Sequence, residues 1–435
     1  MKLINRCMLT ATILLGLSAS TVWGAGLWLY ETGSPDMGTA TAGRAAMARD
    51  ASTAASNPAG MTRLDRTQVM ATALGLDIQA KFDGTTTFSN GLHSATETAG
   101  NGNNAGYFTP AGSLNLVYVA TPDIRIGLAL GSYFGLGLDY GDSWQGRYYV
   151  QSAELLTMGV NPTAAYRVND WFSIGGGVVA LYGKLKQDMA VNNRDPLIGA
   201  DPGDGTLKID SDDWGWGYNL GLLFQPSKGT RIGVTYRSEV ELKFDDVAEA
   251  SGVTGPILGR ISSLINNSSL DMTMKLPQAA TVSIVQQVND RLALMANVGW
   301  QDWSSYGKVE VDLSTVSTSG STTVDAGMKD TWHYAIGAHY RVAEPWLLML
   351  GFAYDTSPVE NDKRSVAMPL DRQIRYATGV EYTVNQDVSV GFSYEFIDCG
   401  SAKIDQNRGP LAGHIVGEYD TNYINAFGLN MNWKF

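Results

Sequence analysis

The chain ends in Tyr423-Ile424-Asn425-Ala426-Phe427-Gly428-Leu429-Asn430-Met431-Asn432-Trp433-Lys434-Phe435, the stretch that decides the fold. Almost every large apolar side chain in it occupies an odd position, and small or polar side chains occupy the even positions. A strand needs such a period of two, over about 10 residues, when one face meets lipid and the other a polar lumen. The stretch therefore predicts the last strand of a transmembrane β-barrel, and the aromatic Phe435 resembles the assembly signal of outer-membrane barrels.

The amino-terminal end predicts export. Lys2 and Arg6 precede an apolar run from Met8 to Leu17, and Val22-Trp23-Gly24 supplies small residues at a signal-peptidase site. The alternative, a membrane-spanning helix, needs roughly 20 apolar residues, which this run does not reach. We therefore expect residues 1–24 to be a signal peptide that is cleaved after Gly24.

The composition excludes several classes of protein. With 49 glycines among 435 residues, 44% hydrophobic residues and a mean hydropathy of -0.09, the chain is unlike a helical membrane protein. Alternation allows a barrel to have this average hydropathy. The net charge of -12 argues against nucleic-acid binding, which needs basic patches. Cys7 would leave with the signal peptide, so Cys399 has no intramolecular partner.

Alternation recurs from Thr67 to the carboxy-terminus and is interrupted in turn by short turns and long polar loops. The pattern predicts an all-β fold, an antiparallel up-and-down β-barrel of about 14 strands spanning residues 67–435, in the bacterial outer membrane. The alternative, a soluble β-sandwich, rarely repeats strands of about 10 residues or more. The predicted periplasmic turns are Asn169-Asp170, Pro226 to Thr230, Asn289-Asp290, Ala343 to Pro345 and Asn385 to Asp387. The predicted extracellular loops are Gln187 to Asp213, Lys243 to Leu270, Ser304 to Met328 and Cys399 to Tyr419.

Two predicted strands show the alternation in detail. In Thr67 to Phe82 we expect the large apolar side chains to face lipid: Met70, Leu74, Leu76, Ile78 and Phe82. The polar Asp77, Gln79 and Lys81 would then face the lumen. In Ile124 to Asp139 the predicted lipid face comprises Ile124, Ile126, Leu128, Leu130, Phe134, Leu136 and Leu138. Its predicted inner face comprises Arg125, Gly127, Ala129, Gly131, Gly135 and Gly137.

Residues 25–66 break the period. The segment is crowded with Gly, Ala, Ser and Thr, especially from Met37 to Gly60, and has too little bulk for a core of its own. Its place before the first strand predicts a plug, or hatch, folded inside the lumen. The alternative is a disordered or periplasmic amino-terminal extension.

Short motifs from the hatch onward resemble those of the FadL/TodX family of outer-membrane transporters for long-chain fatty acids and hydrocarbons. They are Ala25-Gly26-Leu27, Gly43-Arg44-Ala45-Ala46, Asp50-Ala51-Ser52-Thr53, Asn57-Pro58-Ala59-Gly60-Met61, Phe134-Gly135-Leu136, Gly146-Arg147-Tyr148-Tyr149, Asn161-Pro162, Ala165-Tyr166-Arg167, Leu276-Pro277, Trp300 to Trp303, Ala353-Tyr354-Asp355, Ser357-Pro358 and Pro369 with Asp371-Arg372. Their order along nearly the whole chain makes the resemblance specific.

The resemblance implies a monomeric 14-stranded barrel with a hatch inside it, and passage of hydrophobic substrates out sideways through a gap in the wall. The implied hatch residues are Leu27, Trp28, Arg44, Asp50, Asn57, Pro58 and Ala59. The chain departs from the family pattern at two places. Leu27 and Trp28 stand where the best-known member has a Phe, and Pro369-Leu370-Asp371-Arg372 replaces a Pro-Asp-x-x-Arg motif.

One predicted loop carries an apolar stripe at helical spacing. Its members are Ile257, Leu258, Ile261, Leu264 and Ile265. Exposed apolar surface on such a loop predicts a groove that captures an acyl or aromatic substrate. The alternative is a helix that only covers the mouth of the barrel.

Inward-pointing cations are candidates for contact with a substrate headgroup, because they form charge-assisted hydrogen bonds to carboxylates. The candidates are Arg125, His333, His339, Arg372 and Arg375. The alternative is that these cations pair with lumen carboxylates.

Metal binding is not expected. His333 and His339 would stand about 20 Å apart on one strand, too far to share a metal ion. The acidic loop at Asp201, Asp204, Asp210, Asp212 and Asp213 lacks calcium-loop spacing. We expect no metal and no cofactor.

The small inner face of the strand Ile124 to Asp139 predicts a lateral exit at Gly131, Ser132 and Gly135, because glycine in a strand often marks a kink. The alternative is that the glycines make room for the hatch.

No Gly-x-Ser-x-Gly, His-Glu-x-x-His or phosphate-loop motif is present, so we expect a passive channel rather than an enzyme. An adhesin or structural barrel and a lipid hydrolase remain alternatives. The expected partners are a hydrophobic small molecule, outer-membrane lipid and lipopolysaccharide, and the barrel assembly machinery.

Overall fold

The computed structural model of this chain describes residues 35–89, 94–194, 202–245, 247–255, 258–267, 271–312 and 321–435. The predicted signal peptide and Leu27, Trp28 and Ile257 lie outside the described residues.

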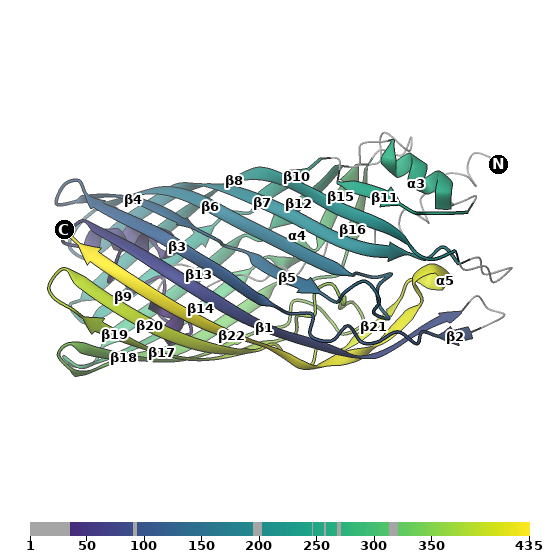
Figure 1. The fold of residues 1–435 in the computed structure, drawn as a ribbon. Coiled ribbons are helices and arrows are strands. Elements are labelled where there is room, and N and C mark those ends of the chain that lie inside the picture. The colour runs from purple at the N-terminus through teal and green to yellow at the C-terminus, as the bar shows by residue number, and fades with distance from the viewer. Residues whose placement is uncertain are drawn as a thin grey trace.

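The wall is a closed barrel of 14 antiparallel strands, as predicted (Figure 1). In order around the wall they are β1 (Gln68–Ser89), β3 (Phe108–Val119), β4 (Ile124–Gly131) continued by β5 (Gly135–Asp139), β6 (Ser152–Arg167), β7 (Phe172–Val191), β8 (Gly205–Ser227), β9 (Thr230–Arg237), β13 (Ala279–Gln287), β14 (Leu292–Gln301), β17 (Thr331–Ala343), β18 (Trp346–Asp355), β19 (Gln373–Thr383), β20 (Val388–Asp398) and β22 (His414–Lys434). The last strand pairs with the first from Gln68↔Lys434 to Thr87↔His414, which leaves no open edge.

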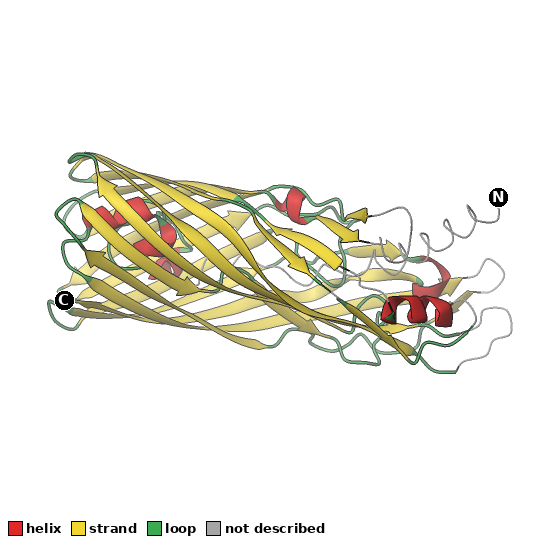
Figure 2. Cartoon of the chain, turned by 90° about the horizontal axis from the view of Figure 1, so that it is seen from above, coloured by secondary structure: helices red, strands yellow, loops and turns green. Residues whose placement is uncertain are grey.

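Shorter elements lie inside the barrel and in the half of the molecule away from the carboxy-terminus (Figures 1 and 2). Inside are η1 (Pro35–Thr39), α2 (Thr53–Ser56) and η2 (Pro58–Arg63). Toward the other end are β2 (Ser94–Thr96), β10 (Val240–Phe244), β11 (Ala248–Ser251), α3 (Leu258–Asn266), β12 (Asp271–Leu276), α4 (Trp303–Tyr306), β15 (Lys308–Asp312), β16 (Ser321–Asp325), β21 (Ile404–Asn407) and α5 (Gly409–Ala412). No helix among the described residues is long and apolar enough to cross a membrane.

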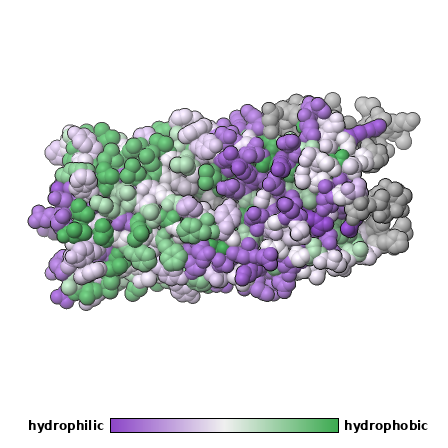
Figure 3. All heavy atoms as spheres, viewed as in Figure 1, coloured by the Kyte–Doolittle hydropathy of each residue, from purple (hydrophilic) through white to green (hydrophobic). Residues whose placement is uncertain are grey.

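The two ends of the barrel differ in surface and in loop length. The five predicted short turns all lie between consecutive wall strands, at the end where the chain terminates (Figure 1). Figure 3 shows hydrophobic residues gathered over this end and hydrophilic ones over the other. Exposed aromatic side chains such as Trp171, Trp346 and Trp433 lie near the short turns, and Trp216 and Trp332 lie farther along the wall. These features indicate a lipid-facing band whose short turns face the periplasm.

The predicted orientation of the apolar side chains of the first strand, toward lipid, is wrong. Met70, Leu74, Leu76, Ile78 and Phe82 are each at most 4% exposed and point into the barrel. Alanines 71 and 73, by contrast, are exposed on the lipid side. The prediction assumed a polar lumen, but much of this lumen is apolar, so the size of a side chain does not reveal its face.

The strand predicted over Ile124 to Asp139 divides into β4 and β5, and its alternation reverses between them. Register gives the reason: Gly131 pairs with Gly159, but Gly135 pairs with Leu156, so one extra residue lies on the β4–β5 side. Such a bulge shifts every later side chain to the other face. Phe134 and Leu138 are therefore buried inside, where the sequence predicted lipid.

The predicted loop from Gln187 to Asp213 is also largely strand. Gln187 to Val191 pairs with Gly205 to Ile209 and lengthens the β7–β8 hairpin. Polar composition misled the prediction, because a strand that projects beyond the membrane needs no lipid-facing side chains.

The described part of the predicted hatch, residues 35–66, lies inside the barrel at its periplasmic end (Figures 1 and 2). Wall glycines allow its backbone to approach closely. A Cβ at Gly351 would collide with the backbone of Thr39, and one at Gly233 with the backbone of Ala45. The absence of a side chain at such positions makes room for the hatch.

Candidate functional site

The lumen above the hatch is lined by apolar side chains that come from many strands. Buried inner-face residues include Phe134, Leu138, Leu155, Leu185, Leu242, Phe244, Met272, Met274, Leu276, Ile397 and Ile424. They belong to one continuous cluster that also contains the loop aromatics Trp144, Tyr149, Trp303 and Tyr306. A channel for ions or sugars keeps a polar lumen. The apolar lining instead suits a solute that is itself hydrophobic.

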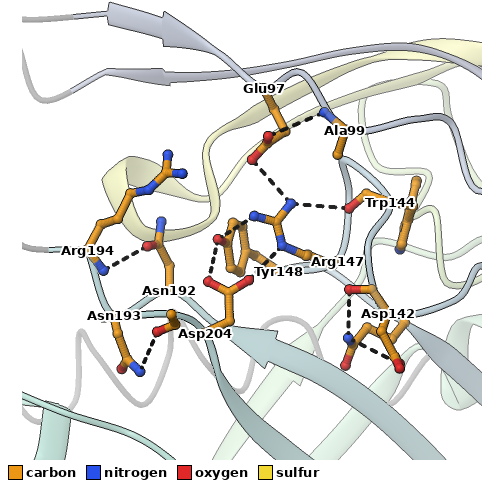
Figure 4. Close-up of polar contacts among 12 residues, drawn as sticks. Glu97, Ala99, Asp142, Trp144, Arg147, Tyr148, Asn192, Asn193, Arg194 and Asp204 are labelled. Carbon is orange, nitrogen blue, oxygen red and sulfur yellow. Dashed lines mark hydrogen bonds and ion pairs between the residues drawn. The ribbon is translucent and has the colours of Figure 1, made fainter. Parts of the chain in front are cut away.

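A network of hydrogen bonds and ion pairs joins the extracellular loops over this lumen (Figure 4). Arg147 Nε donates to Asp204 Oδ2 at 2.7 Å, and Arg147 Nη1 lies 3.1 Å from Glu97 Oε2. The Tyr148 hydroxyl donates to Asp204 Oδ1 at 2.7 Å. Three loops far apart in sequence are thus held by one guanidinium, which accounts structurally for the Gly146-Arg147-Tyr148-Tyr149 motif.

Tyr149 adds further hydrogen bonds between the extracellular loops. Burial raises the pKa of its phenol to about 12, so it stays protonated at neutral pH. Its hydroxyl lies 2.9 Å from Gln406 O and 2.7 Å from Gly413 O. Nearby, the Tyr140 ring stacks on Trp144 with centroids 4.1 Å apart. These contacts join the loop before β6 to the loop before β22.

Asn57 anchors the hatch to itself and to the wall. Its side-chain oxygen accepts from Ala59 N at 3.1 Å, and its amide nitrogen donates to Ala45 O and, at 3.1 Å, to Leu222 O. Pro58 begins η2 directly after it, where a missing N–H costs nothing. Side-chain bonds here replace regular structure, as the Asn-Pro-Ala motif predicts.

Two wall histidines also hold the hatch. His333 is 2% exposed and lies between Thr41 Oγ1 of the hatch, at 3.1 Å from Nε2, and Asp355 Oδ1, at 2.7 Å from Nδ1. Arg375 donates to the other oxygen of Asp355 at 2.8 Å and lies 3.3 Å from Glu395 Oε1. In this buried network the Arg375 guanidinium bridges the two carboxylates of Asp355 and Glu395.

Arg49 connects the hatch to the same two strands, β17 and β19, nearer their periplasmic ends. Its guanidinium lies 2.7 Å from both carboxylate oxygens of Glu381 and 3.0 Å from His339 Nδ1. These groups line a polar cavity of about 310 Å³ at the periplasmic end. His339 and His333 therefore occupy separate contacts with the hatch, as the spacing argument expects.

The two remaining predicted headgroup contacts also have protein partners. Arg125 donates to Leu64 O at 3.0 Å and to Thr121 O at 2.5 Å. Arg372 lies 3.0 Å from Asp398 Oδ2. Asp371, whose motif departs from the family pattern, accepts from the buried Arg364 at 3.0 Å. Pairing of this kind favours structural roles for these cations.

The predicted apolar stripe forms a helix, α3, packed beside β11. Ile265 is buried and Leu258 is partly buried, and both contact the apolar cluster. Asn266 donates to Ala250 O at 2.6 Å and accepts from Ala250 N at 2.8 Å. These contacts fix the helix against β11 and the apolar cluster.

The predicted exit coincides with an interruption of the wall. Residues 108–112 of β3 pair with β1, and β3 meets β4 only from Ser113↔Gly131 onward. Among the described strands β5 pairs with β6 alone. On its free side, Asp139 N donates to Ala105 O at 2.8 Å. Phe134 turns back to β6 instead, where its N–H donates to Thr157 Oγ1 at 2.9 Å.

Gly131, Ser132 and Gly135 therefore lie where the ladder parts. The sequence singled out these three residues but not Tyr133, which points inward and packs against Gly159, nor Arg237, which lies over the Tyr133 ring at 3.8 Å. The bulge had no local signal beyond the interrupted alternation, and Arg237 comes from a strand about a hundred residues later.

The comparisons with known proteins agree with this architecture. A family model described as outer membrane protein transport protein (OMPP1/FadL/TodX) matches residues 15–435. The chain belongs to this family. It is 28% identical to the long-chain fatty acid transport protein of Escherichia coli O6:H1, over 97% of each chain, and 27% identical to outer membrane protein P1 of Haemophilus influenzae, over 100% of each.

Solved structures show the same fold. A Pseudomonas aeruginosa FadL homologue superposes with a TM-score of 0.83 at 22% identity, covering 94% of this chain and 100% of that one. The Pseudomonas putida toluene transporter TodX gives a TM-score of 0.64 at 16% identity, over 92% and 97%. Family membership confirms the predicted outer-membrane location and a transport protein rather than an enzyme.

Proposed function

We propose that this protein is a passive channel that takes up hydrophobic compounds, either long-chain fatty acids or aromatic or aliphatic hydrocarbons, across the outer membrane. The apolar lining of the lumen carries this proposal, because a solute that sheds its water gains free energy only against apolar surface. The names of the relatives, a long-chain fatty acid transport protein and a toluene transporter, support the substrate class.

The proposed path has three steps. The region around α3 captures substrate from lipopolysaccharide, the substrate then enters the apolar lumen, and it finally leaves sideways where β5 separates from β3, at Gly131, Ser132 and Gly135. The hatch blocks the direct way to the periplasm. Hydrogen bonds of Asn57, Arg49 and Thr41 to the wall support the role of the hatch as a plug.

We further propose that the protein works as a monomer and is inserted by the barrel assembly machinery. All 14 wall strands come from one chain, which supports a monomeric pore. Phe435 at the end of the closing strand supports recognition by an assembly factor.

Cross-linking across the proposed exit tests the path. Ser132→Cys would be combined with Ala111→Cys or Gly112→Cys on β3, in a Cys399→Ser background. Oxidation should block uptake of laurate and of toluene by intact cells, and reductant should restore it. Each single-cysteine protein serves as the control. Full uptake by a folded, cross-linked protein would place the exit elsewhere, and equal uptake by cells with and without the protein would refute the channel.

A further inference from the structure

A small cavity lies between the hatch and strands β8, β9 and β13, and Tyr133 from the proposed exit reaches its rim. Its volume is about 60 Å³, enough for a carboxylate group or a few water molecules. Hatch residues Arg44 and Ser56 line one side, and Tyr133, Asn219, Thr235 and Arg237 line the other. None of the described residues that line it carries a carboxylate, although it contains two guanidinium groups.

Arg237 is the unusual member of this group. Its Nη2 lies 3.5 Å from Ala55 O, and its guanidinium carbon lies 3.8 Å above the Tyr133 ring. Within the described part of the chain it has no carboxylate partner at ion-pair distance, unlike Arg49, Arg364 and Arg375. A cation that is partly withdrawn from water without a counter-ion is costly unless a ligand supplies one.

Asn219 gives a second, independent sign that the cavity can bind a ligand. It pairs in register with Arg237 across β8 and β9, so both side chains lie on the inner face. The residue is 4% exposed, yet its side-chain oxygen has no hydrogen-bond partner among the described residues. The assignment of amide oxygen and nitrogen can be exchanged, so this side chain can also present its N–H groups to an acceptor. Hydroxyl groups of Ser56 and Thr235 line the same cavity.

The position of Tyr133 connects this cavity to the membrane. Tyr133 belongs to the bulge between β4 and β5, with Ser132 before it and the free side of β5 after it. A headgroup beside Arg237 would therefore lie next to the Tyr133 ring, and that ring adjoins Ser132 at the parted wall.

We propose that the cavity binds the carboxylate of a single-chain amphiphile, with Arg237 as the residue that sets specificity for acids over neutral hydrocarbons. The proposal rests on the proposed function and narrows its substrate class. Arg237 and the Asn219 amide receive the carboxylate, Tyr133 moves off the guanidinium, and the apolar tail extends through the exit. The cations predicted from sequence, Arg125, Arg372 and Arg375, instead keep their protein partners.

The test compares an acid with a neutral molecule of equal chain length. Purified wild-type protein, Arg237→Gln, Arg237→Lys and the control Arg341→Gln would be titrated with laurate and with dodecanol in detergent. Arg341 is a matched control, since it is an exposed wall arginine paired with Glu344 at the periplasmic end. Heat-modifiable mobility checks folding of each variant.

We expect Arg237→Gln to weaken laurate binding by about tenfold or more, since a hydrogen bond to a charged group is lost, and to leave dodecanol binding unchanged. Arg237→Lys should retain part of the preference, and Arg341→Gln all of it. Unchanged laurate binding, or an equal loss for both ligands, would overturn the role of Arg237 and leave the channel proposal standing. Failure of wild-type protein to bind either ligand would refute both.

Discussion

Single residues show where sequence reasoning reached its limit. Asn57 could be predicted as a structural anchor, because Asn before Pro favours a turn whose side chain bonds to nearby backbone, and its bond to Ala59 N is of that kind. Its bond to Leu222 O joins segments far apart in the chain and had no local signal. Arg237 was missed for the same reason, since only the folded barrel brings it to Tyr133.

Replacing Asn57 should loosen the hatch. Asn57→Ala removes the bonds to Ala45, Ala59 and Leu222, each worth about 1 kcal/mol, and leaves buried backbone groups unpaired. We expect more frequent ion-conducting openings in planar bilayers. Asn407→Ala, a substitution at an exposed position of β21, is the control. A mutant that remains as closed as wild type would show that other contacts hold the hatch.

Gly159 should control the position of Tyr133. A side chain at Gly159 would collide with the Tyr133 ring, so Gly159→Val must push that ring out of its place behind the exit. Uptake of laurate should fall several-fold while the folded fraction stays near that of wild type. Gly100→Ala is the matched control, because nothing lies within 4 Å of the added carbon. Normal uptake by folded Gly159→Val would separate Tyr133 from the path.

At the scale of elements, strands and turns could be predicted but the facing of side chains could not always be. Asn and Asp at three of the five short turns, and Pro at the other two, marked the hairpins correctly together with the alternation between them. Facing failed in β1, whose bulky side chains line an apolar lumen, and in β5, where one extra residue reversed the alternation. In both strands, many of the side chains whose orientation was predicted wrongly line the apolar lumen of the proposed path.

The helix α3 allows the capture and cover roles of the loop stripe to be separated. If the predicted stripe captures substrate, Ile261→Asp should weaken binding of laurate to the folded protein, because a charge beside an apolar ligand is disfavoured. Ile265→Asp, at a position buried against the loops, should instead lower stability. Ligand titration and thermal unfolding of both variants provide the measurement. Wild-type affinity in Ile261→Asp would leave cover as the role of the stripe.

At the scale of the whole molecule, the closed barrel follows from the alternation and the turn residues, and the family motifs strengthened that prediction. The hatch could be placed because a segment of small residues has no core of its own. The apolar lumen could not be predicted, since a wall with large apolar side chains on both faces looks locally like any buried strand. Composition averages the two faces, and only closure of the wall distinguishes them.

Closure itself should depend on Phe435. Its N–H donates to Thr67 O at 2.8 Å, its ring lies 4.5 Å from that of Trp433, and Arg66 Nε donates to its carbonyl at 3.1 Å. The last residue thus joins the closing strand to the start of the first, and an unpaired edge in lipid is costly. Deletion of Phe435 should lower the heat-modifiable folded fraction in outer membranes, whereas Phe435→Tyr, which keeps the ring, should fold normally. If the deletion also folds normally, the pairing of β22 with β1 is sufficient for assembly and the aromatic end is dispensable.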